Sequence, residues 1–476
     1  MAGMSFTAPL AAKPPRPVDL LIHDADVVTF DDAGSVIVDG AIAVEGNSIA
    51  WLGKAEDAPK LFKAKTAIKA TGLTAMPGLI DTHYHTGQQL MRGKLAAINR
   101  KGPSRSPHWK HYYVPFESAL TPDDVYYSAI SGYTSMISAG TTCFLEAGGP
   151  QPDEMGRAAD EIGIRGRIAL STMDADDDEL PRTYRMTTDQ ALRANQDLVE
   201  RWRKHPRVNA WLSLRQIMVN TETLRIEAAK LAQGLDTGIH THLSEGTYEI
   251  DYALATYGLR PPAYFEKIGL LTNRLHCAYS PLLTPEEVDL YGRYDVSVAH
   301  CAFNFYGMAP HGFSDMVRKG MRVGLGTDGT GSRCTLDLFQ VAHYAVIGQQ
   351  IIAGLPQYAP EPLGYDRMLK LAVRQGARAA RMGAQLGSLE VGKLADIVLV
   401  ATTDYDQYPS VDPVITLAQN CVGRDVRTVI IDGRIVMRDR QFQTIDLESM
   451  QRRVNEQYLS LMERYDNALN RGNTPG

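Results

Sequence analysis

Short apolar runs alternate with amphipathic helical segments between Leu73 and about Gly383, and this alternation constrains the fold more than any other feature. Eight runs occur, which read TAMPGLID, TTCFLEAG, RGRIALST, RVNAWLSL, TGIHTHLS, NRLHCAYS, DVSVAHC and RVGLGTDG. Helical periodicity between and after them predicts helices at 122–139, 188–204, 222–234, 284–292, 312–319 and 366–382. Eight strand–helix alternations predict an α/β fold, a parallel barrel with its helices outside. A doubly wound open sheet is the alternative.

The two ends of the chain have a different character. Residues 18–72 and 384–443 read as short strands broken at Gly and Asp, and we expect them to pair into one β-sandwich domain beside the 73–383 barrel. Residues 1–17 are expected to form a flexible tail. Residues 444–476 are expected to form an amphipathic helix and a tail, and the apolar residues at three- and four-residue steps predict that this helix packs on the body.

Composition excludes several classes of protein. The 476 residues are 44% hydrophobic and 22% charged, which supports a sizeable core and excludes global disorder. The formal net charge of −6, with mixed signs, gives no electrostatic case for nucleic acid or for a membrane surface. The five cysteines are scattered without a CxxC pair, which favours reduced thiols and a cytoplasmic location. No apolar stretch approaches the roughly 18 residues of a membrane span, and no signal peptide is expected.

Histidines stand where the predicted strands end. His83 and His85 form an H-x-H pair after the first run, and alternate strand residues face the same side, about 6–7 Å apart. His242 and Glu245 follow the fifth run, with a spacing that suits a metal ligand and a proton carrier reaching over the metal. Two imidazoles that point into the mouth of a barrel can share one metal ion.

Two further strand ends add polar groups. His276 ends the sixth run and Asp328 ends the eighth. Each alone has an ordinary explanation, since a buried strand-end His is usually a hydrogen-bonded core residue and Asp before Gly is usually a turn. Together, four strands place His or Asp at their carboxyl ends, where barrel enzymes keep their chemistry, and this predicts a metal site.

The types of donor atom limit which metal ion the site could hold. Imidazoles with one carboxylate suit Zn²⁺ best and Fe²⁺ as an alternative, and they disfavour Ca²⁺ and Mg²⁺. An open coordination position on the ion would hold a water molecule, and the ion would lower the pKa of that water from 15.7 to about 7.

One motif competes with this interpretation. Gly324, Gly326 and Gly329 match G-x-G-x-x-G after a strand, but dinucleotide binding also needs an acidic residue about 20 positions on. Residues 345–350 read AVIGQQ, without an acid. The H-x-E and P-C-x-x-C signature of one class of zinc deaminases is absent too, because the chain has no CxxC.

On these motifs the chain resembles the amidohydrolase superfamily. MPGLIDTHYH, HTHLSE, LHCAYS, VAHCAFN, GLGTDG, LGSLEVGKLADIVLV and VIIDGRIV occur in the family's order and cover nearly the whole chain. The branch it resembles contains cytosine, guanine and S-adenosylhomocysteine deaminases and atrazine chlorohydrolase. The resemblance implies a distorted (β/α)8 TIM barrel with a composite β-sandwich from both ends of the chain.

The resemblance also implies roles for the strand-end residues. The implied ligands of a single metal ion are His83, His85, His242 and Asp328. Glu245 would shuttle protons between the water and a ring nitrogen, His276 would orient and polarise the attacking water, and Asp328 would also accept its proton. The binuclear branch uses a carbamylated lysine after the fourth strand, where this chain reads AWLSLRQIMVN without a lysine.

The chain departs from the family at positions that face the substrate. The G-P-H segment after the fourth strand is replaced by Leu214, Arg215 and Gln216, the segment HCAFN lacks the family's Pro and Ser, and the acidic pair after LMRG gives way to NRKGPSRSPHWK. The candidate substrate-binding residues are Gln89, His108, Trp109, Arg215, Gln216, His300, Asn304, Tyr306 and Arg333. A solvated loop role is the alternative for His108, Trp109, Arg215, Gln216, Tyr306 and Arg333.

The resemblance implies an aminohydrolase. We expect a metal-bound hydroxide to attack an amino-substituted heterocycle of purine, pterin, pyrimidine or triazine type and release ammonia. The alternatives are loss of chloride or an alkylamine from a triazine-like compound, hydrolysis of a cyclic amide, and a catalytically silent binding protein. We expect no nucleic-acid or membrane partner, and by analogy a homodimer or higher homo-oligomer.

Overall fold

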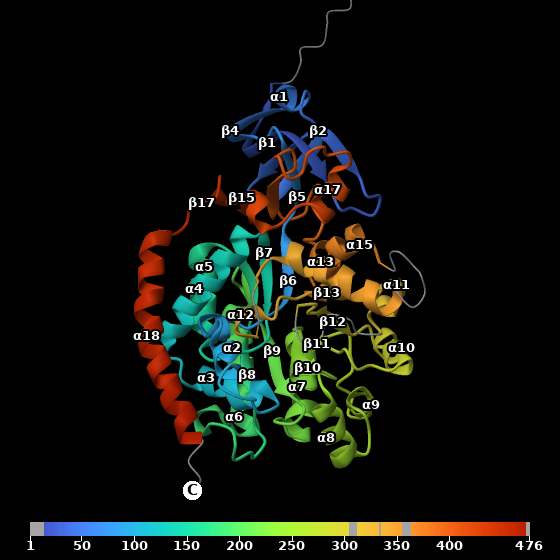
Figure 1. Cartoon of the computed structure of the whole chain (residues 1–476). Coiled ribbons are helices and arrows are strands. Elements are labelled where there is room, and N and C mark those ends of the chain that lie inside the picture. Colours follow the sequence, from blue (N-terminus) through green and yellow to red (C-terminus); the bar gives the residue numbers. More distant parts are fainter. Residues whose placement is uncertain (1–13, 304–311, 333–334, 355–362, 473–476) are drawn as a thin grey trace, which may run out of the picture.

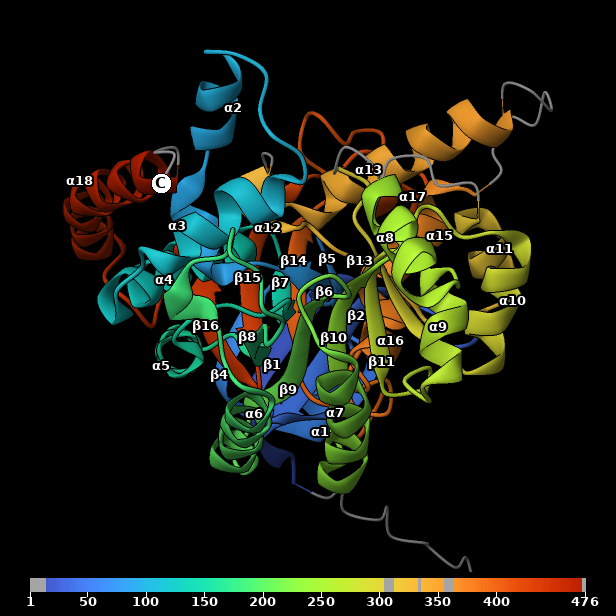
Figure 2. The same cartoon turned by 90° about the horizontal axis from the view of Figure 1, so that it is seen from below.

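The computed structural model of the chain describes residues 14–303, 312–332, 335–354 and 363–472 (Figure 1). A barrel and a smaller β domain lie one above the other, and a long C-terminal helix runs down one side of the barrel. Seen from below, helices surround the strands of the barrel (Figure 2).

Eight parallel strands form the barrel in the order in which they occur along the chain. They are β6 (Leu79–Tyr84), β7 (Thr141–Glu146), β8 (Arg165–Thr172), β9 (Val208–Gln216), β10 (Ile239–Leu243), β11 (Leu275–Tyr279), β12 (Ser297–His300) and β13 (Val323–Leu325). β13 lies against β6, where the Thr82 hydroxyl donates to the carbonyl of Leu325 at 2.9 Å. The predicted parallel barrel is confirmed, and the open sheet is excluded.

Helices cross over between successive strands, as predicted. They include α4 (Pro122–Ser138), α5 (Pro152–Ile162), α6 (Thr188–Trp202), α7 (Glu222–Leu235), α8 (Thr247–Tyr257), α9 (Pro261–Lys267), α10 (Pro285–Arg293) and α11 (Phe313–Arg318), and α13 (Leu338–Gln349) follows the last strand. A threonine side chain accepts a hydrogen bond from the first turn of α4, α6, α7 and α10 and so defines where each begins. The helical stretch near 366–382 comprises α15 (Tyr365–Lys370), η5 (Leu371–Gln375) and α16 (Gly376–Ala379).

The β domain combines both ends of the chain in one nine-stranded mixed sheet, with the order β17-β16-β15-β14-β5-β1-β2-β3 and with β4 paired to β1. Its strands are β1 (Arg16–Val28), β2 (Val36–Glu45), β3 (Ser48–Lys54), β4 (Phe62–Lys69), β5 (Leu73–Pro77), β14 (Ile397–Ala401), β15 (Val426–Ile431), β16 (Arg434–Arg438) and β17 (Gln441–Phe442). β5 joins the two halves, because it pairs with β1 on one side and with β14 on the other. The composite domain predicted from the sequence is confirmed.

Two predicted boundaries shift. The run TAMPGLID is one predicted strand, but the structure divides it at Pro77 and Gly78, so that β5 belongs to the β domain and β6 to the barrel. Proline has no N–H for a continuous ladder, and a Cβ at Gly78 would lie 2.0 Å from Thr142 Oγ1. β1 begins at Arg16, inside the segment assigned to the flexible tail, of which residues 1–13 lie outside the described chain.

The β domain is attached to the amino ends of the barrel strands. Arg165, the first residue of β8, is buried and binds both carboxylate oxygens of Asp396 at 3.0 Å and one of Asp432 at 3.0 Å. The N–H of Gly78 donates to the carbonyl of Asp396 at 3.0 Å. The opposite end of the barrel, where the strands finish, therefore stays open to form a site.

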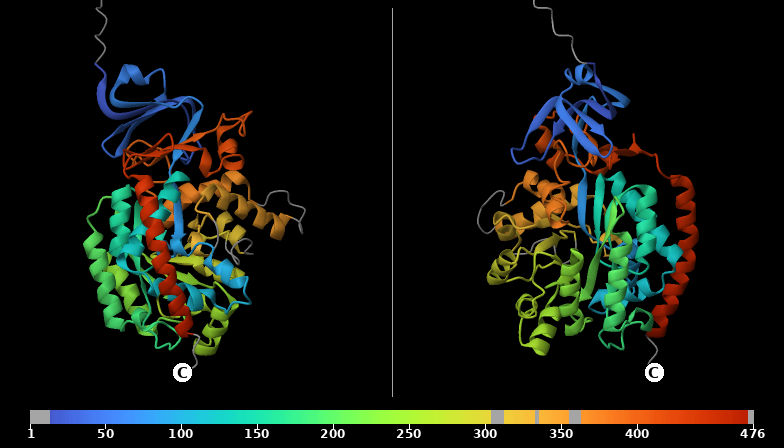
Figure 3. Two further views of the ribbon diagram at one scale, coloured as in Figure 1. Left: turned by 60° about the vertical axis from the view of Figure 1, so that its left-hand side comes forward. Right: turned by 180° about the vertical axis from the view of Figure 1, so that it is seen from behind.

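The C-terminal helix α18 (Leu447–Gly472) packs along the barrel as predicted (Figure 3). Leu461 and Tyr465 are fully buried, and the hydroxyl of Tyr465 donates to the carbonyl of Tyr112 at 3.1 Å. None of the described helices combines the length and the apolar character needed to cross a bilayer.

The glycines of the G-x-G-x-x-G motif have a structural role at the barrel seam. A Cβ on Gly324 would lie 2.3 Å from Thr82 Cγ2, and one on Gly326 would lie 2.8 Å from His83 Cβ. Gly329 has φ +75°. The missing side chains let β13 approach β6 closely, so dinucleotide binding is not needed to explain the motif.

We expect Gly324→Ala to destabilise the protein by about 1–3 kcal/mol, because the added methyl group overpacks the seam against a short branched side chain. Thermal unfolding of the purified variant measures this. Gly234→Ala in α7 is the matched control: a Cβ there meets nothing within 4 Å, and the change should be neutral or stabilising by up to about 1 kcal/mol. Equal melting temperatures for Gly324→Ala and the wild type would contradict the tight seam.

Candidate active site

Four polar side chains converge at the carboxyl ends of three barrel strands. Asp328 Oδ1 lies 3.2 Å from His83 Nε2 and 3.6 Å from His85 Nε2. His242 Nε2 lies 3.3 Å from His85 Nε2. One nitrogen from each of the three histidines lies within 4.8 Å of the others. The four residues predicted as metal ligands are therefore brought together.

Buried hydrogen bonds hold these ligands in position. The Nδ1 of His242 contacts the carbonyl of Arg215 at 2.7 Å, and the Nδ1 of His83 contacts His240 Nε2 at 2.9 Å. Contacts of this kind to the second ring nitrogen orient metal-binding histidines. Burial lowers the pKa of His85 and of His242 well below its usual value, so both imidazoles are neutral at pH 7 and present lone pairs to a cation.

The residues fit a divalent transition metal. His83 Nε2 is buried and has no hydrogen-bond partner among the described residues, yet it faces the Asp328 carboxylate. Three imidazole nitrogens and one carboxylate oxygen are a donor set that Zn²⁺ and Fe²⁺ accept. The cluster is thus a candidate site for one divalent ion, with a face open to the pocket.

Asp81 and Asp328 connect the end of β6 to the loop after β13, next to the candidate ligands. The Asp81 carboxylate accepts hydrogen bonds from the N–H of His83 at 3.1 Å and from the N–H and hydroxyl of Thr327 at 3.0 and 2.5 Å. The N–H of Asp328 donates to the carbonyl of His83 at 2.9 Å. Burial raises the pKa of Asp81 to about 7. These contacts tie the first and last strands together beneath the cluster.

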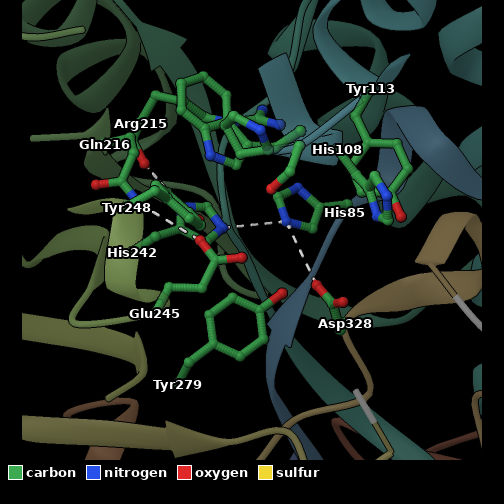
Figure 4. Close-up of a pocket in the computed structure, with 13 residues that line it drawn as sticks. His85, His108, Tyr113, Arg215, Gln216, His242, Glu245, Tyr248, Tyr279 and Asp328 are labelled. Carbon is green, nitrogen blue, oxygen red and sulfur yellow. Dashed lines mark hydrogen bonds and ion pairs between the residues drawn. The ribbon is translucent and has the colours of Figure 1, made fainter. Parts of the chain in front are cut away.

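A pocket opens over the cluster (Figure 4). Its walls combine charged, amide and aromatic side chains from separate segments, namely His85, Ser106, Pro107, His108, Trp109, Tyr113, Arg215, Gln216, His242, Glu245, Tyr248, Tyr279 and Asp328. Four large aromatic rings over a polar floor make a cleft suited to a flat ring compound.

Glu245 stands in the pocket wall beside the cluster, as predicted (Figure 4). Its carboxylate accepts a hydrogen bond from Gln216 Nε2 at 3.4 Å, and its N–H donates to Glu249 Oε2 at 2.8 Å. Burial, with a smaller contribution from the Asp328 charge, raises the pKa of Glu245 to about 7. A carboxyl group with such a pKa can both accept and donate a proton near neutral pH.

The structure places His276 away from this pocket. Strand register sets His276 beside His240, one layer below His242. Its Nε2 contacts the carbonyl of Thr82 at 2.8 Å and its Nδ1 contacts Ser297 Oγ at 2.9 Å. Both ring nitrogens are therefore occupied inside the barrel, and this position does not support the expected role in orienting the attacking water.

The predicted substrate-binding residues divide into three groups. His108, Trp109, Arg215 and Gln216 line the pocket. Gln89 and His300 do not: the Gln89 carboxamide oxygen accepts from the Thr330 hydroxyl at 2.8 Å, and the His300 ring stacks on Phe313 at 3.8 Å. Asn304, Tyr306 and Arg333 lie outside the described residues.

Buried Glu117 holds the Arg215 guanidinium. Arg215 Nη1 donates to its two carboxylate oxygens at 3.1 and 2.9 Å. The Glu117 carboxylate also accepts a hydrogen bond from Gln88 Nε2 at 2.7 Å and one from the Tyr184 hydroxyl at 3.1 Å. The charge of Arg215 is therefore balanced within the pocket wall, in a network that the sequence did not indicate.

The segment that contributes Ser106 to Tyr113 closes one side of the pocket. Lys110 pairs with Asp177 at 2.8 Å and with Glu179 at 2.6 Å, and Arg105 pairs with Glu179 at 2.9 Å. The basic character noted in NRKGPSRSPHWK thus anchors the segment to the loop after β8, while Trp109 faces the pocket.

The sequence did not indicate the three tyrosines of the pocket, Tyr113, Tyr248 and Tyr279. Tyr113 lies in η2 (Trp109–Tyr113), a single π-helical turn, and Tyr248 lies in the first turn of α8. Tyr279 ends β11 with φ 68°, a conformation that strand periodicity does not anticipate.

Comparison with known proteins agrees with this geometry. The profile described as the Amidohydrolase family matches residues 74–436. The chain belongs to the amidohydrolase family. It is thereby a hydrolase of C–N bonds other than peptide bonds, in the deaminase and chlorohydrolase branch that the motifs resemble.

Named relatives cover almost the whole chain. A 5-methylthioadenosine/S-adenosylhomocysteine deaminase of Desulforudis audaxviator is 30% identical over 449 residues, which are 93% of this chain and 99% of that protein. The crystal structure of an adenosine deaminase from Xanthomonas campestris with bound zinc has a TM-score of 0.86 at 26% identity, covering 94% of this chain and all of that one. Zinc-bound atrazine chlorohydrolase from Arthrobacter aurescens shares the fold, with a TM-score of 0.80 at 22% identity over 92% of this chain and 100% of that chain.

We expect the purified protein to retain about one equivalent of a divalent transition metal and His242→Ala to lose most of it, because the variant removes one of few ligands. Elemental analysis by mass spectrometry measures the metal content. His23→Ala, a partly exposed histidine of the β domain, is the control and should keep the metal. Full metal content in His242→Ala would remove this residue from the ligand set.

Proposed function

We propose that this protein hydrolytically deaminates an amino-substituted aromatic heterocycle of purine, pterin, pyrimidine or triazine type and releases ammonia. The observation that carries the proposal is the position of Glu245, a carboxyl group with a raised pKa beside a His and Asp cluster in a pocket walled by aromatic rings. A group that moves protons, next to a metal site and a flat cleft, matches what this reaction requires.

We propose one Zn²⁺ ion as the cofactor, with Fe²⁺ as the alternative for the same donors. His83, His85, His242 and Asp328 would hold it, as their convergent atoms indicate. When bound, the ion supplies Lewis acidity that makes water a competent nucleophile near neutral pH.

Glu245 is the proton carrier in this proposal. Its carboxylate takes a proton from the incoming water and gives it to the ring nitrogen next to the reacting carbon. The water oxygen adds to that carbon, which becomes tetrahedral. Gln216, which donates to Glu245 Oε2, keeps the carboxylate directed into the pocket.

Asp328 completes the proton balance. Its carboxylate accepts the second proton of the water, and this proton passes to the amino group as the carbon–nitrogen bond breaks. The carbon regains its planar geometry with a carbonyl oxygen in place of the amine. The products are the oxo heterocycle and ammonia, so the atoms of substrate and water balance.

We propose that Trp109, Tyr113 and Tyr248 bind the faces and edges of the heterocycle, since aromatic walls suit a planar ring. Arg215 and Gln216 supply donors to its oxygen or nitrogen atoms, since both line the pocket. The names of relatives as 5-methylthioadenosine/S-adenosylhomocysteine and adenosine deaminases support amine release from a purine-like ring.

A screen for ammonia release across aminopurines, pterins, aminopyrimidines and s-triazines tests the reaction. On any compound that is turned over, we expect Glu245→Gln to lower kcat by about 10²–10⁴-fold, because the amide cannot carry the proton. The variant should keep its metal. Glu227→Gln, which changes an exposed carboxylate of α7, should leave kcat unchanged.

Other outcomes separate the alternatives. Chloride or alkylamine release without ammonia would move the protein to the dechlorinating or dealkylaminating reaction on the same site. No turnover of any heterocycle by metal-loaded protein would favour a silent binding protein and contradict the proposal.

The pH dependence tests the direction of proton transfer. Since burial raises the pKa of Glu245 to about 7, and the ionised form accepts the proton, kcat/KM should fall about tenfold per unit as the pH drops below about 7. It should be flat just above that value. A rate that instead increases below pH 7 would show that the protonated form is the reactive one. The residual activity of Glu245→Gln should lack this limb.

A further inference from the structure

The last residue of β11, Tyr279, points into the site although the alternation of a regular strand would direct its side chain away. In the register of β10 and β11, His240 pairs with His276 and His242 with Ala278, so these residues face the barrel interior. Alternation would direct Tyr279, one position later, to the outside. Instead its ring lies 5.2 Å from the ring of His83 and 5.7 Å from that of His242, between centroids.

Backbone conformation explains this reversal. Tyr279 and Ser280 both have positive φ, 68° and 52°, which costs side-chain-bearing residues energy and must be stabilised by the surrounding structure. The Ser280 hydroxyl donates to the carbonyl of Leu243 at 3.0 Å and contacts the Tyr291 hydroxyl at 3.2 Å. These buried contacts hold the turn, and the turn aims Tyr279 back into the pocket.

The hydroxyl of Tyr279 reaches the reacting region. Tyr279 and Asp328 both line the pocket, and the Asp328 carboxylate contributes, after burial, to raising the pKa of the Tyr279 hydroxyl well above its usual value. Figure 4 shows this hydroxyl pointing into the space between Glu245, His85 and Asp328. A phenol hydroxyl both donates and accepts hydrogen bonds, so it can direct the carboxylate of Asp328 and still meet an oxygen that enters this space.

We propose that Tyr279 is a catalytic residue of this enzyme: its hydroxyl orients the Asp328 carboxylate and donates a hydrogen bond to the oxygen that adds to the substrate ring. The family resemblance implied this contact with the adding oxygen for His276, whose ring nitrogens are both occupied below the pocket. Tyr279 keeps its proton throughout, so the proton path through Glu245 and Asp328 is unchanged. The assignment rests on the proposed deamination.

Ala278 makes room for this arrangement. It faces the interior at the level of His242 and is fully buried, and it packs with Tyr279, Ala299 and Cys301 in a small cluster. A larger side chain at position 278 would intrude on the space below the candidate metal ligands. A small inward residue followed by an inverted tyrosine thus places a single hydroxyl above the ligands.

Tyr279→Phe tests the proposal, because it removes the hydroxyl and keeps the ring. At saturating metal we expect kcat to fall about 100-fold with KM changed less than about threefold, since the lost contact forms to the adding oxygen. Tyr294→Phe, which removes the hydroxyl bonded to Glu266 at 3.0 Å on the surface, should match the wild type. Tyr279→His, which tolerates positive φ better than most residues, should recover part of kcat.

A second measurement does not depend on turnover. Chelator competition should show metal bound about 10-fold more weakly or worse in Tyr279→Phe, because partners of a ligating carboxylate tune metal affinity, while Tyr294→Phe binds metal as the wild type does. A kcat within about threefold of wild type at saturating metal would overturn the proposal. If the wild-type protein deaminates no compound, the proposed function fails by itself, and unchanged metal affinity in Tyr279→Phe would then overturn the role of Tyr279.

Discussion

The site depends on the hydrogen-bonded seam at which the first and last barrel strands meet. His83 and His85 lie on one side of this seam and Asp328 on the other, so these candidate metal ligands come together only when the barrel closes. Glycines at 324 and 326 let the backbones approach, and Asp81 links the two sides through His83 and Thr327. Barrel closure and assembly of the metal site are therefore the same structural event.

Four residues with left-handed backbone lie at the end of the barrel that carries the pocket. Ser244, Tyr279, Ser280 and Asp328 all have positive φ, and each follows or ends a barrel strand. Turns of this kind redirect side chains that a regular strand would point elsewhere, and the surrounding fold must stabilise them. Raised pKa values at Glu146 and Glu249, each to about 8 through burial, show that the barrel also holds carboxyl groups where solvent is excluded.

The β domain and the pocket lie at opposite ends of the barrel. The β domain binds the amino ends of the strands through the buried pairs of Arg165 with Asp396 and Asp432. The carboxyl ends remain free for the pocket, which the segment with Trp109 and Tyr113 covers from one side. Because Lys110 anchors this segment to Asp177 and Glu179, the aromatic wall is held by charges that do not line the pocket.

Local patterns in the sequence were sufficient to predict the barrel and the composite β domain. They also placed the candidate ligands His83, His85, His242 and Asp328 and the carboxylate of Glu245 at one rim, since strand periodicity and strand direction bring these residues together. Only the tertiary structure decided that His276 lies below the pocket and that Tyr279 enters it. The physical reason is the left-handed backbone at 279 and 280, which reverses the alternation of a regular strand. Contacts from distant strands stabilise that turn, and no local pattern records them.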